Sequence, residues 1–584
     1  MPMPGETDTG PAAQRGADVL AGSLIAAGVR TLFGVPGDTG VTFYDALRRR
    51  ASEIRHVLMR DERHAAAAAD AYARVSNTAG VVEVSSGGGV TYVVGGLGEA
   101  YAASVPLLVI TSDIHTRSRG TGALTEIDQE TLLRAVTKWR LTVGDARQIP
   151  EAVAEALHQA TSGRPAPAAL IFPEDVLDAT VPAAPRQRLR GDAVTLPAGR
   201  PAAPAAAVGE AARQIARAER PAMLAGSGVH VSGAYRNLRL LAERAGIAVA
   251  TTIHGKGAIP DSSACALGVA GNNGGRPYAN SYLRSADAVL LVGTRANATD
   301  TNMWRGPARD GRAAVIQIDI EPGRAGRNFP GSLGLAGDAG TVLGQLAGAV
   351  PADAARRERV TGAIREARRR WDAEHAPGPD GEPGTLTASR VVRALGEALG
   401  PGTLVIADPG TPTPNVAAFW EITRAGRTVI VPRGHGPMGY AIPAAVGAAF
   451  ARPRRPVLAI TADGSFAMSC GELETVARLG LPVIFVQLTN FSLGWIKMLQ
   501  HLYFGQRYFG VDPGPIDAPQ VARAAGIEGV HVTSLGELKA VAAEAAASLR
   551  PVYADVTVPS PMDDVPPVAS WHDARSGSHE RPVY

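Results

Sequence analysis

Short apolar and β-branched runs bounded by Gly or Pro alternate with Ala- and Leu-rich stretches along most of the chain. Within the first 180 residues, the predicted strands are 29–35, 54–58, 80–86, 106–112 and 167–172, and the predicted helices are 17–28, 62–75, 91–103 and 149–161. Continuous apolar strands with helices between them are typical of parallel strands buried on both faces. The pattern therefore predicts an α/β fold with an open parallel sheet.

The same rhythm returns twice further along the chain. The later predicted strands are 222–226, 247–252, 288–294 and 313–320, then 403–407, 428–431, 456–461, 482–489 and 551–558. We therefore predict three open parallel-sheet α/β domains, at 17–183, 206–350 and 389–559. A Pro-, Arg- and Ala-rich linker is expected at 184–205, and a helical stretch followed by a Pro/Gly linker at 351–388. Flexible tails are expected at 1–16 and 560–584.

Composition excludes several classes of protein. The 584 residues contain 58 Lys and Arg against 55 Asp and Glu, without the clustered basic residues that nucleic-acid binding requires. No run of apolar residues is long enough for a membrane span, and the first residues do not resemble a secretory signal. Two cysteines are too few for a disulfide framework or a zinc cluster. We expect a cytoplasmic protein that binds neither nucleic acid nor membrane.

Candidate metal- and phosphate-binding residues stand after two predicted strands of the third domain. Asp463 and Gly464 come directly after the strand at 456–461, and Asn490 follows the strand at 482–489. Since parallel strands end at the same edge of a sheet, the two side chains should lie close together. Both offer oxygen, the ligand that Mg²⁺ and Ca²⁺ prefer, and Gly464 and Ser465 leave backbone N–H groups open to a phosphate.

The helix between these strands also has sequence signals. Ser469 and Glu472 are spaced as a capping box before a helix that begins at Cys470, and Gly480 is placed to end it. An Asp-Gly pair after a strand is in most proteins only a turn. The position of Asn490 at the end of the next strand is what favours a binding site.

The segment from Asp463 to Asn490 resembles the thiamine diphosphate (ThDP) signature, Gly-Asp-Gly followed after about two dozen residues by Asn-Asn. Ala462 and Thr489 depart from that pattern, whereas Asp463 and Asn490 match its metal ligands. The resemblance implies ThDP and Mg²⁺ as cofactors. It also implies that the Ser492 carbonyl is a third metal ligand.

A glycine-rich stretch at 434–445 resembles the acetohydroxyacid synthase (acetolactate synthase) branch of the same superfamily. By that resemblance, Met438 wedges between the two rings of ThDP and the Gly436 carbonyl accepts a hydrogen bond from its 4′-amino group. Gly410 and Thr411 are assigned to cofactor binding in the same way. Without this context Met438 would be ordinary core filler.

In the first domain, Glu62 lies in Arg-Asp-Glu-Arg-His, which resembles the family's His-Glu-Gln segment. Glu62 corresponds to the glutamate that activates ThDP at N1′ of the aminopyrimidine, and a raised pKa would suit that role. An isolated Glu there would be a first-turn acid favoured by the helix dipole. The segments 34–38 and 85–91 extend the match, and Gln129 corresponds to a substrate contact.

The family's architecture assigns the aminopyrimidine to the first domain and the diphosphate to the third. It implies that each active site forms between two chains, in a homodimer or homotetramer.

The central domain departs from the synthase pattern. Residues 293–299 read Gly-Thr-Arg-Ala-Asn-Ala-Thr where the family has Gly-x-Arg-Phe-Asp-Asp-Arg, so Thr299 replaces an arginine suited to a carboxylate. Asp128 and Leu499 also replace the family's aromatic residues. FAD in the central domain is therefore an open alternative that these changes disfavour.

The sequence predicts a ThDP- and Mg²⁺-dependent enzyme that decarboxylates a 2-oxo acid such as pyruvate and joins the acyl-anion equivalent to a second carbonyl compound. One alternative is a simple decarboxylase that releases an aldehyde. Another is a non-catalytic ThDP-binding regulatory subunit. A nicotinamide dehydrogenase is disfavoured because no Gly-x-Gly-x-x-Gly follows a first strand.

Overall fold

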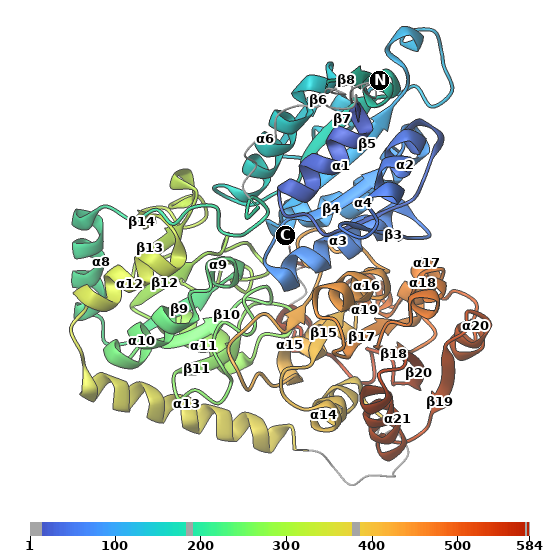
Figure 1. The fold of residues 1–584 in the computed structure, drawn as a ribbon. Helices are drawn as coiled ribbons and strands as arrows, with labels where there is room; N and C mark the ends of the chain where they lie inside the picture. The colour runs from blue at the N-terminus through green and yellow to red at the C-terminus, as the bar shows by residue number, and fades with distance from the viewer. Residues whose placement is uncertain (1–13, 183–190, 377–385, 578–580, 583–584) are drawn as a thin grey trace, which may run out of the picture. The chain divides into compact units, whose positions relative to one another are not determined.

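Three six-stranded parallel sheets, each flanked by helices, form the fold in the computed structural model (Figure 1). The structure describes residues 14–182, 191–376, 386–577 and 581–582. The chain divides into two units, residues 1–198 with the first sheet and residues 199–584 with the other two. The predicted α/β class with three open parallel sheets is confirmed.

The first sheet has the strand order β3-β2-β4-β5-β7-β6. Its strands are β2 (Thr31–Gly34), β3 (Arg55–Leu58), β4 (Gly80–Val84), β5 (Leu107–Asp113), β6 (Trp139–Thr142) and β7 (Ala168–Pro173). The helices of this unit are α1 (Gly16–Ala26), α2 (Val41–Arg49), α3 (Glu62–Ser76), α4 (Gly88–Ala103), α5 (Gln129–Leu133), α6 (Ile149–Thr161) and α7 (Glu174–Asp178). Every residue of β4, β5 and β7 is buried, as expected of strands covered on both faces.

Helix α3 places Glu62 at its first position. The Asp61 side chain accepts a hydrogen bond from the Arg63 backbone N–H and so caps the helix, and Asn77 in the left-handed conformation ends it. Five consecutive alanines, 65–69, are buried in the helix. Their small side chains let α3 pack closely against α4.

The central sheet has the order β11-β10-β9-β12-β13-β14. Its strands are β9 (Pro221–Ala225), β10 (Ala248–Thr251), β11 (Ala266–Val269), β12 (Ala288–Val292), β13 (Ala314–Asp319) and β14 (Leu333–Ala336). Its helices are α8 (Ala205–Arg217), α9 (Ser227–Ser232), α10 (Tyr235–Ala245), α11 (Pro277–Ser285), α12 (Ala339–Ala349) and the long α13 (Ala354–Glu374). This is the strand order of doubly wound dinucleotide-binding sheets.

The third sheet has the order β16-β15-β17-β18-β20-β19. Its strands are β15 (Leu404–Ala407), β16 (Val429–Ile430), β17 (Val457–Ala462), β18 (Val483–Thr489), β19 (Glu528–Val532) and β20 (Val552–Thr557). The helices are α14 (Ala388–Leu399), α15 (Pro412–Phe419), α16 (Ala441–Ala451), α17 (Asp463–Ser469), α18 (Glu472–Leu479), α19 (Gly494–Tyr503), α20 (Ala518–Ala524), α21 (Leu535–Ser548) and α22 (Ala569–Arg575).

The first and third sheets share one topology. Numbering the strands of each sheet along the chain, both have the order 2-1-3-4-6-5. The connections therefore leave the first strand of each sheet on opposite sides. This switch point lies between β2 and β4 in the first sheet, and between β15 and β17 in the third. Open α/β sheets bind ligands beyond the carboxyl ends of the strands at such a switch point.

Several predicted segments differ from the structure. Strands β6, β11, β14 and β19 were not predicted. The prediction of a capping box at Ser469 and Glu472 was wrong. Ser469 is the last residue of α17, and its hydroxyl donates to the Ser465 carbonyl, whereas α18 begins at Glu472. Gly480 does end α18 in the left-handed conformation.

The predicted tails also differ from the structure where it describes them. Residues 1–13 lie outside the described residues, but Gln14–Arg15 form β1, which pairs antiparallel with β8 (Thr180–Val181). Residues 560–584 were predicted as a tail, yet Ala569–Arg575 form α22 and Trp571 is only 1% exposed. Apolar side chains from α19 cover this tryptophan, and a local sequence pattern does not reveal such long-range burial.

Candidate active site

A cavity of about 210 Å³ lies at the carboxyl ends of β15, β17 and β18. It is lined by all nine third-domain residues that the sequence assigned to cofactor and metal binding: Gly410, Thr411, Gly436, Met438, Asp463, Gly464, Ser465, Asn490 and Ser492. These residues come from four separate segments of the chain. The parallel strands bring them together, because the loops that follow such strands share one edge of the sheet.

Asp463 is the first residue of α17, and its carboxylate joins the ends of two strands. Its Oδ1 accepts a hydrogen bond from the Gly464 backbone N–H at 2.9 Å. Its Oδ2 accepts from the backbone N–H groups of Asn490 at 3.1 Å and Phe491 at 2.6 Å. Burial raises the pKa of Asp463, and these three donors oppose the rise. The carboxylate is therefore fixed in orientation before any ligand binds.

Asn490 and Ser492 form a tight loop directly after β18. The Asn490 Oδ1 accepts from the Ser492 hydroxyl at 2.9 Å and from the Ser492 N–H at 3.2 Å. Phe491 between them has a positive φ of 58°, which bends the backbone sharply. The loop therefore holds the Asn490 amide oxygen near Asp463, whose carboxylate accepts hydrogen bonds from the backbone of the same loop.

The cavity suits a group that approaches the backbone closely. A Cβ at Gly464 would lie 2.7 Å from Leu493 Cδ2 and 3.4 Å from Met438 Cε, so a side chain there would fill the space. Met438 is 39% exposed and lines the cavity. The donors are one carboxylate and one amide with nearby backbone oxygens, a hard-oxygen set that fits Mg²⁺ with phosphate. Among the described residues, no group of three His, Cys, Asp or Glu side chains is arranged for a metal.

Asp408 lies beside the cavity, at the end of β15, and connects the segments that form it. The sequence analysis did not identify this residue. It directly follows β15 and is fully buried. Its Oδ2 accepts from the Thr461 hydroxyl of β17 at 2.7 Å, and its Oδ1 accepts from the Ala441 N–H at 2.9 Å. Ala441 begins α16, so Asp408 ties the glycine-rich segment before α16 to the sheet. Burial raises the pKa of Asp408 to about 6.

The C-terminal segment supports one wall of the same cavity. Trp495 lines the cavity and its ring lies 4.4 Å, centroid to centroid, from that of the buried Trp571 in α22. Leu499, the residue that replaces the family's tryptophan, packs against the same cluster of Met498, Val568 and Trp571. This support was also missed, because residues 560–584 carry no periodic pattern.

In the first unit, Glu62 lies half-buried at the start of α3. A Cβ at Gly89 would lie 3.3 Å from Glu62 Oε1, so the start of α4 runs close to this carboxylate. Burial raises the pKa of Glu62, and the adjacent Asp61 carboxylate raises it further. The direction of the shift agrees with the sequence expectation.

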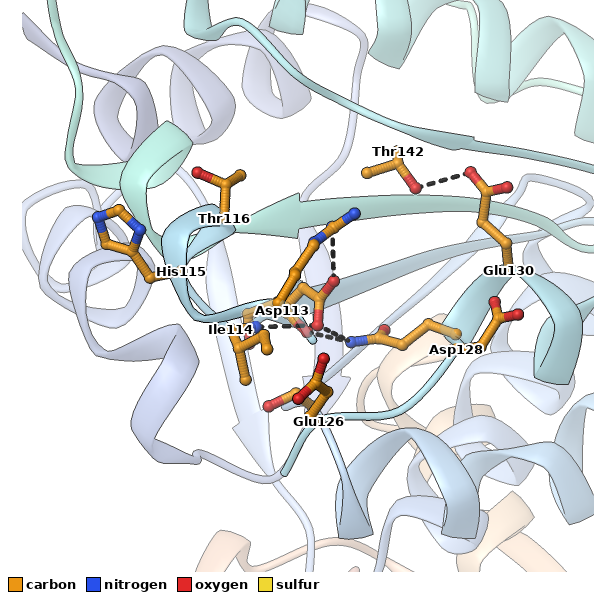
Figure 2. Close-up of polar contacts among 12 residues, drawn as sticks. Asp113, Ile114, His115, Thr116, Glu126, Asp128, Glu130 and Thr142 are labelled. Atoms are coloured by element: carbon orange, nitrogen blue, oxygen red, sulfur yellow. Dashed lines mark hydrogen bonds and ion pairs between the residues drawn. The ribbon is translucent and has the colours of Figure 1, made fainter. Parts of the chain in front are cut away.

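Gln129 is only 3% exposed, and its amide is held inside the first unit. Its Nε2 donates to the Ser112 carbonyl and to Asp113 Oδ1, both at 3.0 Å, and its Oε1 accepts from the Thr111 hydroxyl at 2.8 Å. The residue borders a cavity of about 600 Å³. Four acids that line this cavity are labelled in Figure 2: Asp113, Glu126, Asp128 and Glu130. The hydrogen bonds of Gln129 position the end of β5 and leave little of the amide for a substrate.

The segment that departs from the synthase pattern lies at the switch point of the central sheet. A Cβ at Gly228 would lie 2.7 Å from Gly293 Cα, so the loops after β9 and β12 touch backbone to backbone. The Thr299 carbonyl accepts from the Asn272 N–H at 2.8 Å. Thr299 therefore helps to hold this loop through its backbone.

Among the residues that the structure describes, none forms a helix both long and apolar enough to cross a bilayer.

Three domains of one enzyme family match the chain, in the same order as its three sheets. The N-terminal TPP-binding domain of thiamine pyrophosphate enzymes matches residues 14–132, their central domain matches 208–346 and their C-terminal TPP-binding domain matches 408–556. The last of these spans β17, β18 and the cavity at their ends.

Similar proteins match over nearly their whole length. The chain is 34% identical to the probable acetolactate synthase large subunit of Methanocaldococcus jannaschii, over 95% of this chain and 93% of that protein. It is 31% identical to the corresponding protein of Methanococcus aeolicus, over 97% and 96% of the two chains. It is 32% identical to the acetolactate synthase of Arthrospira platensis, over 96% of each. The chain therefore belongs to the thiamine pyrophosphate enzyme family, in the group that contains the acetolactate synthases.

Proposed function

We propose that this protein is a ThDP- and Mg²⁺-dependent carboligase. It decarboxylates a 2-oxo acid such as pyruvate and transfers the acyl-anion equivalent to a second carbonyl substrate, as an acetolactate synthase-like enzyme does. The observation that carries the proposal is the cavity at the ends of β15, β17 and β18, because all nine residues assigned from the cofactor motifs line it.

The third domain binds the diphosphate end of the cofactor. Asp463, Asn490 and the Ser492 carbonyl hold Mg²⁺, and the orientation of Asp463 by three backbone N–H groups supports this role. Gly464 and Ser465 line the cavity at the start of α17, and the missing side chain of Gly464 leaves room for the diphosphate to approach the backbone. Gly410 and Thr411, Gly436 and Met438 line the remaining walls.

The first unit supplies the proton chemistry. Glu62 holds a proton at N1′ of the aminopyrimidine, and its raised pKa supports such a shared proton. When bound, ThDP supplies the electron sink for decarboxylation and acyl transfer. Gln129 acts on substrate through the end of β5 that it positions, because its own amide is occupied within the unit.

The proposal includes a homodimer or homotetramer in the cytoplasm. The residues for the two ends of the cofactor belong to different units of the chain, which fits a site completed by two chains. Both cysteines are free, Cys265 buried and Cys470 partly so, as is usual in a reducing compartment.

The decisive experiment is product analysis with the purified full chain, ThDP and Mg²⁺. Pyruvate is supplied alone, then with a panel of aldehydes and 2-oxo acids, and products are identified by NMR. We expect a hydroxyketone or hydroxy-oxo acid that contains both substrates. Release of free aldehyde alone would show a simple decarboxylase, and no turnover with bound ThDP would show a non-catalytic subunit. Glu53→Gln, which changes an exposed carboxyl, is the matched control for variants of Glu62.

The central domain is tested separately by spectroscopy. The loops after β9 and β12 meet backbone to backbone, and the expected arginine is Thr299, so our proposal includes no flavin. An absorbance spectrum of the purified protein with flavin bands would contradict this part of the proposal and leave the ThDP assignment intact.

A further inference from the structure

Glu83 is a carboxyl group in the middle of a buried strand. It lies in β4, where its Cα pairs in register with that of Gly34 of β2, at the switch point of the first sheet. Its side chain is 1% exposed. A Cβ at Gly34 would lie 2.7 Å from Glu83 Oε2 and 3.1 Å from His56 Nε2, so the glycine leaves the room that these side chains occupy. A buried charge in such a place is costly unless it is neutralised.

The groups that face Glu83 do not neutralise it. The Tyr44 hydroxyl of α2 donates a hydrogen bond to Glu83 Oε2. His56 of β3 lies with Nε2 3.8 Å from the same oxygen, but burial lowers the pKa of His56 to about 4, so the imidazole is uncharged at neutral pH. Glu62 of α3 adds a negative charge that acts on both Glu83 and Tyr44. Within residues 14–182, which the structure describes, no cationic group lowers the pKa of Glu83.

The charge of Glu62 acts on Glu83. Ser85 directly follows β4, two residues after Glu83. A Cβ at Gly89 would lie 2.9 Å from Ser85 Oγ and 3.3 Å from Glu62 Oε1, so both atoms border the same small space. Burial, together with the Glu62 charge, raises the pKa of Glu83 to about 8.

We propose that Glu83 is a positioning residue for Glu62: a buried acid that remains protonated in the working enzyme and whose ionisation places a second negative charge beside Glu62 and suppresses turnover. The proposal rests on the proposed role of Glu62. Two carboxylates in one low-dielectric site repel each other, so ionised Glu83 would raise the pKa of Glu62. Glu62 would then keep its proton too tightly to share it with the cofactor.

The first test measures ionisation without any catalysis. Infrared spectra of the cofactor-free full chain are recorded from about pH 7 to about pH 10, a range in which ordinary carboxyl groups are already ionised. We expect a protonated-carboxyl band that disappears with a midpoint of about 8 and is missing from Glu83→Gln. Wild-type protein without such a band would overturn the inference, whatever its activity.

The second test asks whether this ionisation controls turnover. The pH profile of kcat/KM is measured for wild type, Glu83→Gln, Tyr44→Phe and the control Glu53→Gln. Wild type and the control should lose activity above about pH 8, with the same midpoint as the infrared band. Glu83→Gln should lack that alkaline transition, since an amide does not ionise.

Tyr44→Phe gives a shift that a structural role alone would not produce. The Tyr44 hydrogen bond lowers the pKa of Glu83, so its removal should move both the infrared and the activity midpoints to higher pH. This variant keeps the test valid if Glu83→Gln does not fold. Alkaline transitions with an unchanged midpoint in both variants would overturn the inference, whereas absence of turnover at every pH would contradict the proposed function instead.

Discussion

The first and third sheets have the same strand order, and each places a buried acid at its switch point, but the two acids are held differently. Asp408 accepts hydrogen bonds from the Thr461 hydroxyl and the Ala441 N–H, and its pKa rises only to about 6. Glu83 accepts from Tyr44 and faces the Glu62 charge, and its pKa rises to about 8. The number of donors that stabilise the charged form separates the two.

This contrast matches the two tasks that we propose for the shared topology. In the third domain, backbone N–H groups donate to Asp408 and Asp463 and oppose the rise in pKa that burial causes, which favours the charged form of each carboxyl. In the first unit, burial without a cation keeps a proton on the acid, which suits proton transfer. The predictions below test whether the two regions divide the work in this way, starting with the largest expected effect.

Glu62→Gln should lower kcat by roughly 10²- to 10⁴-fold, because it removes the carboxyl that holds the shared proton. Binding of ThDP should be retained, since the residues proposed for the diphosphate belong to the other unit. Steady-state kinetics and calorimetric titration with ThDP and Mg²⁺ measure the two quantities. A variant with normal turnover would remove Glu62 from the mechanism.

Trp571→Ala should destabilise the C-terminal unit by about 3–5 kcal/mol, because a fully buried aromatic side chain leaves a cavity. Since Trp571 packs on Trp495, which lines the cofactor cavity, ThDP should bind more weakly as well. Denaturant unfolding with and without ThDP and Mg²⁺ tests both effects. A change below about 1 kcal/mol would mean that the terminal helix does not support the unit.

Asp463→Ala should weaken Mg²⁺-dependent ThDP binding by roughly 100-fold or more, because it removes a proposed metal ligand and the group that joins the loops after β17 and β18. Calorimetric titration measures the loss. Comparison of Asp463→Ala with Glu62→Gln separates cofactor binding from proton transfer. An equal loss of ThDP binding in both variants would contradict the proposal that the third domain binds the cofactor and the first unit transfers the proton.

Gly464→Ala should fold but bind ThDP about 10-fold more weakly, since the new methyl meets Leu493 and narrows the cavity. The matched control is Gly536→Ala in α21, where no atom lies within 4 Å of the added Cβ. That control should be neutral or stabilising by about 0.5–1 kcal/mol. Unchanged affinity for Gly464→Ala would place the diphosphate away from α17.

Much of the third-domain site could be predicted because its residues follow strands. The runs ending near 461 and 489 are visible as apolar segments, and the ends of neighbouring parallel strands meet at one edge. Asp463 and Asn490 were therefore expected to be neighbours, and they line one cavity. Gln129 could be placed in the family pattern, but its internal hydrogen bonds could not be foreseen.

The residues that sequence reasoning missed depend on partners far away along the chain. Glu83 looked like one polar position in a predicted strand, and nothing local indicated that Tyr44 and His56 face it. Asp408 followed a strand without a recognisable motif. Trp571 stood in a segment without periodicity, and its burial comes from α19.

The amino-acid sequence by itself determined the α/β class, the alternation of strands and helices, and the loops that we propose to hold the cofactor, because these depend on short-range periodicity and on residue types at strand ends. Tertiary structure alone decided the strand order, the support of the cavity by α22 and the charge states of Glu83 and Asp408. A pKa depends on burial and on the donors and charges nearby, and only the folded chain brings those groups together.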